Sequence, residues 1–153
     1  METSPSPTPA APVEAEDEDV VSISLVVTGD HLDVDLPTRR LRAIPVLAAR
    51  RGEDAEAIAQ GITDPMPRWE YRVICPGNCT LNAAVDLLLE PLPDDPEVWD
   101  DLASQGMLVV ECALLLPSET SDCVLSSKTM ARLATRHLNL ILHLVDRAPF
   151  PAS

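Results

Sequence analysis

The segment M107-L-V-V-E-C-A-L-L-L116 constrains the fold more than any other part of the chain, because nine of its ten residues are apolar. A strand that is apolar on both faces belongs in the interior of a sheet. The segment is also well below the roughly 18 apolar residues that span a bilayer. It therefore predicts a central strand of a sheet in a globular domain.

Three further segments alternate apolar and other residues with the period of two that is typical of strands. They are residues 20–28, which stop at Gly29, residues 69–75, which stop at Pro76-Gly77, and residues 138–145. The core face of the first is expected to hold Val21, Ile23, Leu25 and Val27. The sequence thus predicts four strands.

Three helices are predicted from an apolar stripe that follows a capping residue. Thr80 caps the first, and Asp95, with Pro96 at the first helical position, caps the second. Ser126 or Ser127 caps the third, whose expected stripe is Met130, Leu133, Ala134 and His137. A shorter helix of two turns at most is expected before Pro45. Residues 46–67 have little period, and we expect an irregular excursion there with a turn of helix near residues 54–60.

The predicted order is β-α-β-α-α-β-α-β, in which helices separate the strands. It indicates an α+β fold with a four-stranded sheet and helices packed mainly on one face. Aromatic residues are only 3% of the chain, so the core has to be aliphatic. Residues 1–19 are rich in proline and acid and contain no basic residue, so we expect a disordered tail. Residues 20–146 then form a single domain, and residues 147–153 a short C-terminal tail.

The chain is acidic, with 25 acidic against 11 basic residues and a net charge of -14. Without the six acids of the first 19 residues, 19 acids still face 11 basic residues, a charge of -8. Such a surface repels phosphate backbones and anionic membranes, so neither nucleic acid nor a membrane is expected as a partner. The first residues do not resemble a secretory signal, and the four cysteines are expected to be reduced thiols of a cytoplasmic protein.

The stretch Gly29-Asp30-x-Leu32-Asp33-x-x-x-x-Thr38-x-x-Leu41-x-x-x-Pro45, directly after a strand, resembles the opening of the bacterial domain-of-unknown-function family 4279, which typically begins with a G-D-x-L-D turn. The likeness continues through Arg51-Gly52-Glu53 and the strand entered by Trp69, and it covers about residues 20–146. Pro37 and Arg42 depart from the pattern, in which an apolar residue and a glycine are usual. The resemblance implies a small α+β domain, sometimes encoded near bacterial toxin systems. It carries over no catalytic residue.

The aspartates after Gly29 suggest a metal loop, but their spacing does not fit the common calcium pattern. An EF-hand needs ligands at positions 1, 3 and 5 and a glycine at position 6, whereas counting from Asp30 gives Leu32 at position 3 and Asp35 at position 6. Short acidic side chains also cap backbone N–H groups at a helix start. We therefore interpret Asp30, Asp33 and Asp35 first as a turn and a helix start.

The cysteines and histidines form no recognisable catalytic or metal motif. Cys75-Pro-Gly-Asn-Cys79 is spaced more loosely than a zinc knuckle or a redox pair, and Cys112 lies in an apolar strand. His137 and His143 fall on a helix stripe and a strand face, where packed histidines are common. No nucleophile elbow, zinc-protease motif or phosphate-binding glycine loop is present. We predict no catalytic residues, no metal and no cofactor, and we favour a protein that is not an enzyme.

Two hypotheses of function follow. The first is a non-catalytic cytoplasmic binding protein of the immunity type, which neutralises a cognate toxin or another basic protein through acidic loops, because opposite charges speed encounter. The residues that it would use are Asp30, His31, Asp33, Asp35, Asp94, Asp95, Asp100 and Asp101. The alternative is a metal-assisted hydrolase that uses the Asp30–Asp35 loop with His31. A homodimer through the Leu140 or Trp99 face is compatible with the first hypothesis.

Overall fold

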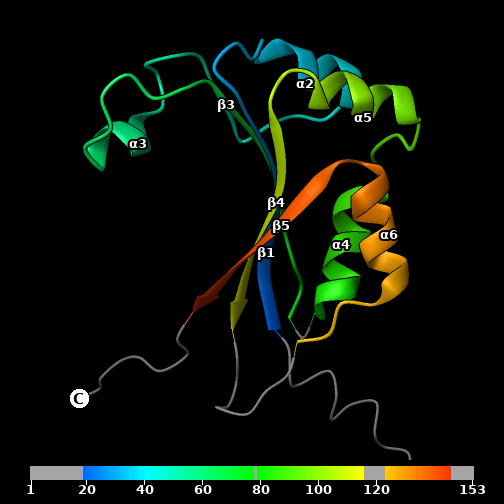
Figure 1. Ribbon diagram of the computed structural model, residues 1–153. Coiled ribbons are helices and arrows are strands. Elements are labelled where there is room, and N and C mark those ends of the chain that lie inside the picture. The colour runs from blue at the N-terminus through cyan, green and yellow to red at the C-terminus, as the bar shows by residue number, and fades with distance from the viewer. Residues whose placement is uncertain (1–18, 78, 116–122, 146–153) are drawn as a thin grey trace, which may run out of the picture.

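The computed structural model describes residues 19–77, 79–115 and 123–145, and it contains a five-stranded sheet of order β2-β3-β1-β4-β5 (Figure 1). β4 and β5 are parallel, and the other neighbours are antiparallel. The strands are β1 (Asp19–Thr28), β2 (Leu47–Ala49), β3 (Arg68–Ile74), β4 (Met107–Leu115) and β5 (Leu138–Val145). The predicted central strand that begins at Met107 is β4, and it lies inside the sheet between β1 and β5.

The prediction of a four-stranded sheet is wrong, although the α+β class is confirmed. The additional strand is β2, whose three residues pair with Arg68 to Glu70 of β3. It lies within the excursion that was expected to be irregular. Three residues, two of them alanine, are too few to show a period of two, so the sequence pattern alone could not reveal this strand.

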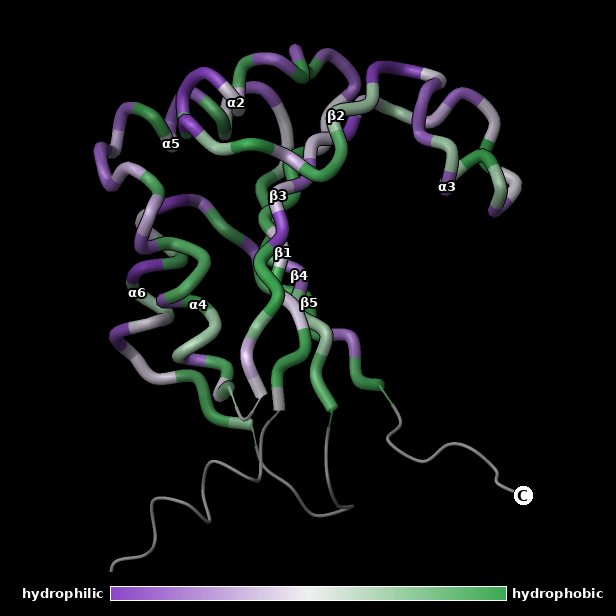
Figure 2. Tube along the Cα trace, turned by 180° about the vertical axis from the view of Figure 1, so that it is seen from behind, coloured by the Kyte–Doolittle hydropathy of each residue, from purple (hydrophilic) through white to green (hydrophobic). Residues whose placement is uncertain are grey.

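Five helices accompany the sheet: α2 (Asp35–Leu41), α3 (Ala55–Ala59), α4 (Leu81–Leu89), α5 (Pro96–Ala103) and α6 (Ser127–Thr135). α4 and α6 lie side by side against one face of the sheet, whereas α3 lies on the opposite side (Figures 1 and 2). α2 and α5 contact each other at one end of the sheet, at the top of Figure 1. The helical turn expected near residues 54–60 is α3, which Asp54 caps.

The predicted caps of the three longer helices are confirmed. Side-chain oxygens of Thr80, Asp95 and Ser126 accept hydrogen bonds from backbone N–H groups two or three residues later, at 3.2, 3.0 and 3.1 Å respectively. A cap satisfies one of the donors that a helix start leaves unpaired. These local signals place α4, α5 and α6 without reference to the rest of the fold.

The core lies between the sheet and the helices α4, α5 and α6, and it is chiefly aliphatic. The strand register aligns Ile23, Leu25 and Val27 of β1 with apolar residues of β3 and β4 on the same face. A bulge near the start of β1 interrupts the alternation: Val20 is fully buried, whereas Val21, which was expected in the core, is 42% exposed. The bulge adds one residue to β1, so the residues before it change face.

Two buried tryptophans fix the position of α2 and α5 at the upper end of the sheet. The Nε1–H of Trp69 on β3 donates to Thr38 Oγ1 of α2 at 3.0 Å, and that of Trp99 on α5 donates to the carbonyl oxygen of Pro93 at 2.8 Å. Both rings are fully buried, so Trp99 offers no face to a second copy of the chain. No helix in the described segments is long and apolar enough to cross a membrane.

His137 is not part of a buried stripe on α6, contrary to expectation. It lies two residues beyond Thr135, the last residue of α6, in the left-handed conformation with φ 59°, and its side chain is half exposed. Its Nε2 lies 2.7 Å from Asp100 Oδ1 of α5. Met130 is also exposed, which leaves Leu133 as the buried side chain of the predicted stripe. The predicted N-terminal tail was residues 1–19, but Asp19 is the first residue of β1. The rest of that tail, residues 1–18, and the predicted C-terminal tail, residues 147–153, lie outside the described residues.

Candidate functional site

The loop after β1 and the connection from α5 to β4 lie backbone to backbone, because both contain a glycine at the point of contact. A Cβ atom on Gly106 would overlap the carbonyl oxygen of Thr28, and one on Gly29 would lie 2.5 Å from the carbonyl oxygen of Gln105. The N–H of Asp33 donates to Gln105 Oε1 at 3.3 Å. The first predicted acidic cluster is therefore held next to the helix that carries the second.

An ion pair joins α2 to α5, since Arg40 Nε lies 3.1 Å from Asp101 Oδ2. We call this end of the molecule the acidic end and define it as residues 29–34, α2, Asp94, Asp95 and α5. All eight residues predicted to bind a partner belong to it: Asp30, His31, Asp33, Asp35, Asp94, Asp95, Asp100 and Asp101. The fold thus brings to one end of the sheet two clusters that are 59 residues apart in the sequence, from Asp35 to Asp94.

The three aspartates of the loop face different arginines. Arg51 binds Asp30 at 3.0 Å and Asp64 at 3.3 Å, Arg50 binds Asp35 at 3.2 Å, and Arg39 lies 3.6 Å from Asp33. The hydrogen bond that Arg51 donates to Asp30 is the main cause that raises the pKa of Arg51.

The backbone also engages this loop, since Asp33 Oδ1 accepts the N–H of Asp35, as expected for a turn before a helix. In the described segments, no group of three or more His, Cys, Asp or Glu side chains is arranged to hold a metal ion. The carboxylates of the loop therefore serve arginines and a helix start in this structure.

The acids of α5 face outward and have fewer partners. Asp94 and Glu97 are exposed, and neither forms an ion pair with another described residue. Asp95 caps the helix, Asp100 contacts His137, and Asp101 pairs with Arg40. Glu97 was not among the predicted binding residues, because its position in the first turn explains it as a helix-dipole residue. The structure shows that it also extends the acidic surface.

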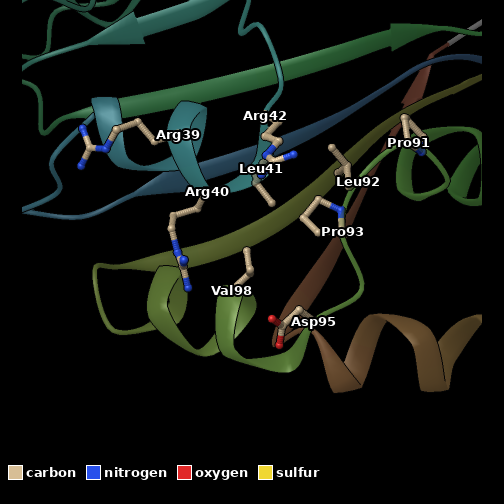
Figure 3. Close-up of a pocket in the computed structure, with 9 residues that line it drawn as sticks. All are labelled: Arg39, Arg40, Leu41, Arg42, Pro91, Leu92, Pro93, Asp95 and Val98. Atoms are coloured by element: carbon tan, nitrogen blue, oxygen red, sulfur yellow. The ribbon is translucent and has the colours of Figure 1, made fainter.

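A pocket of about 410 Å³ lies within the acidic end, between the end of α2, residues 91–95 and the start of α5 (Figure 3). Its middle is apolar. Arg40 and Asp95 stand at its edge beside α5, and Arg39 points away from the other labelled side chains. The apolar side chains that line it are Leu41, Leu92, Pro93 and Val98. An apolar hollow with a charged rim is typical of a site that receives an anchoring side chain from a partner.

Arg42 on the rim of this pocket has an unusual backbone. It follows the last residue of α2 with φ 56° and ψ 43°, and its N–H donates to the Thr38 carbonyl oxygen at 2.9 Å. Its exposed guanidinium has no hydrogen bond or ion pair with any other described residue. Among the arginines around the pocket, it is therefore the one available to a ligand or partner.

Sequence reasoning did not predict this pocket. Its lining comes from two segments about 50 residues apart, so no local pattern reveals that they meet. The run Pro91-Leu92-Pro93 is the one local signal, because two prolines hold an apolar residue in an extended turn.

The cysteines and the remaining histidines lie in the core, in a loop and on a strand. Cys75, Cys79 and Cys112 are buried members of the core, and Cys123 is exposed. His31 is exposed in the loop after β1, and His143 lies on the far face of the sheet, 3.8 Å from Glu111.

A row of charged residues crosses the face of the sheet opposite α4 and α6, and sequence reasoning missed it. Glu70 is only 6% exposed and accepts hydrogen bonds from Arg72 at 2.7 and 3.1 Å. Arg68 lies between Glu70 and Glu111, at 3.4 and 3.6 Å. The signal was present in the alternation of Arg68, Glu70 and Arg72 along one strand face.

Burial raises the pKa of Glu70, but the hydrogen bonds from Arg72 and Ser24, together with the charges of Arg72 and Arg68, outweigh burial and lower it below the usual value. Glu70 is therefore ionised and paired. The same face has a pocket of about 370 Å³ beside α3, lined partly by Arg68, Glu111 and His143. Because Glu70 and Glu111 both face arginine, the row joins two strands of the sheet, β3 and β4, by ion pairs.

Comparison with known proteins gives one match. A family model described as a domain of unknown function, DUF4279, matches residues 19–146, which is most of the chain and nearly all of its described part. No curated protein and no solved structure matches the chain.

Proposed function

The chain belongs to the DUF4279 family, whose function is unknown, and we propose that it is a non-catalytic protein that binds a basic protein partner at its acidic end. In its specific form, the proposal is an immunity-type protein of the cytoplasm that neutralises a cognate toxin. One observation supports it above the others: two acidic clusters distant in sequence lie on adjacent elements, and an apolar pocket lies between the end of α2 and the start of α5.

Charge and shape favour a protein partner over a small substrate. The outward acids of α5 supply a field that attracts a basic surface and speeds encounter. The pocket between α2 and α5 supplies the apolar centre on which affinity at protein interfaces depends. The arginines of α2 and of the turn after β2 pair with the loop aspartates and hold them in place before binding, which reduces the entropy lost on association.

The geometry does not favour the hydrolase alternative. A metal held by Asp30, Asp33 and Asp35 would have to displace Arg51, Arg39 and Arg50 from these carboxylates and Asp33 from the backbone of Asp35. No other contact in the described residues would compensate for the loss of these pairs, so we favour the binding protein.

The experiment that tests the proposal is co-expression with the product of the adjacent gene, followed by affinity capture and a measurement of association rate. Binding should bring a stable complex and, if that product is toxic, rescue of growth. If no complex forms and growth is not rescued, the proposal is contradicted.

A pair of variants with the same change in charge locates the surface. Glu97→Lys on α5 should slow association with the captured partner roughly tenfold at low salt, and high salt should reduce the difference, because long-range attraction is screened. Glu56→Lys on α3, an exposed residue on the other side of the sheet, is the control. Equal effects of the two variants would show that net charge, and not the acidic end, controls binding.

A further inference from the structure

β5 is an edge strand whose outer side has no strand beside it in the described part of the chain. It pairs with β4 alone, in parallel, over all eight residues from Leu138 to Val145. The opposite edge of the sheet is β2, which has only three residues. β5 is therefore the long free edge of this sheet, and a free edge presents unpaired backbone donors and acceptors to any strand that approaches it.

The composition of β5 leaves this edge without the usual protection against pairing with another strand. Natural edge strands are protected by lysine, proline, bulges or inward charges, but L138-N-L-I-L-H-L-V145 contains no acidic residue, lysine, arginine or proline. Its second half extends past α4 and α6, as Figure 1 shows for the dark red end of the strand. Four large apolar side chains are exposed there: Ile141 at 42%, Leu142 at 39%, Leu144 at 63% and Val145 at 45%.

We propose that β5 pairs with β5 of a second copy of this chain, antiparallel and edge to edge, to form one continuous ten-stranded sheet. The pattern of the strand fits its own copy. If the two-fold axis passes at Leu142, Leu140 faces the partner's Leu144 and Ile141 faces the partner's His143. The leucines of β5 share one face, so this register extends the apolar stripe across the two-fold axis.

Charge selects a second copy over another occupant. β5 has no charged group with which to recognise an acidic or a basic peptide, whereas pairing with itself brings no like charges together. The acidic end lies by the start of β5, at α2 and α5, and the exposed half of β5 lies away from it (Figure 1). Antiparallel pairing through that half points the two acidic ends in opposite directions, which minimises repulsion between two chains of charge -14.

The oligomeric state of the full chain tests the proposal. Light scattering over a range of concentrations should show a dimer that dissociates on dilution, because the pairing of one strand buries a small interface. Leu144→Asp should give a monomer with an unchanged circular dichroism spectrum, and Ile44→Asp, which alters a side chain that is 86% exposed outside β5, should leave the dimer intact. A monomer at every concentration, or equal effects of the two variants, would overturn the proposal.

Cross-linking tests the register separately. In a Cys123→Ser background, Leu142→Cys should form a disulfide between two copies under mild oxidation, because residues opposite each other at the two-fold axis have Cα atoms about 4.5–5.5 Å apart. Asn139→Cys, which faces the partner's Val145, should remain a monomer on a non-reducing gel. Cross-linking of Asn139→Cys without Leu142→Cys would overturn this register. The proposal does not depend on the acidic end, so loss of the dimer and loss of a partner complex are separate results.

Discussion

At the scale of one residue, Arg42 has a strained backbone conformation. Its φ of 56° lies in the left-handed region, where a Cβ atom approaches the following carbonyl oxygen and glycine is favoured. The position directly follows a helix, where glycine most often ends the helix. An arginine there lowers stability and places a guanidinium on the rim of the pocket, which is consistent with a role in binding.

Replacement of this residue should therefore stabilise the protein. Arg42→Gly is expected to raise the free energy of unfolding by about 0.5–1 kcal/mol, because relief of the left-handed strain exceeds the added freedom of the unfolded chain. Urea denaturation measures the change. Arg42→Ala keeps the strain and serves as the control. A loss of stability in Arg42→Gly would mean that the arginine side chain stabilises the fold through contacts.

The contact of Gly29 with Gly106 makes the opposite prediction. Gly106→Ala is expected to lower the free energy of unfolding by roughly 1–3 kcal/mol, because its methyl group would overlap the Thr28 carbonyl oxygen and force the β1 and β4 ends apart. Gly77→Ala is a matched control, since a Cβ atom at Gly77 meets nothing within 4 Å. Similar thermal denaturation curves for the two variants would refute this account of the close approach.

At the scale of the element, the strands explain both the success and the failure of the sequence patterns. The long alternating segments predicted β1 and β3, and the apolar run predicted β4, because these strands have one or two buried faces. β5 was also predicted from its alternation, although only its first residue, Leu138, is buried. β2 has too few residues for a pattern, and the bulge that buries Val20 and exposes Val21 depends on pairing with β4. Helix starts were predictable because their caps are local, whereas the exposed position of His137 depends on where α6 ends.

The buried row on β3 gives a prediction for acid. The folded pKa of Glu70 is lowered, so its ionised form stabilises the protein above the ordinary pKa of the side chain, 4.5, and this contribution is lost as the pH falls through the lower folded value. Glu70→Gln should therefore lower the free energy of unfolding by roughly 1–3 kcal/mol at pH 7, because it removes hydrogen bonds to a charged group. The difference in the free energy of unfolding between the two proteins should be smaller at pH 3. Urea denaturation at both pH values measures it, and a constant deficit would contradict the assignment to ionisation.

At the scale of the whole molecule, the two surfaces that we propose lie in different places: the acidic end at one end of the sheet and the pairing strand at its edge. The acidic end is built from loops and short helices, and the edge that pairs two copies is a strand. The sequence supplied the acids of the first surface, since charge and turn residues are visible in any chain. It could not show that the clusters meet or that a pocket lies between them, because these facts depend on Gly29 and Gly106 and on the contact between α2 and α5.

The order of strands also determines when this protein can fold during synthesis. β1 precedes its partners in the chain, yet it occupies the middle of the sheet, and its two neighbours follow only at Arg68 and Met107. β3 can cover one edge of β1 once it has emerged from the ribosome, but the other edge stays unpaired in the nascent chain until β4 has emerged as far as Leu115. Contacts so distant in sequence form slowly, so chaperones that shield emerging hydrophobic segments should matter most for this domain while β1 awaits β4.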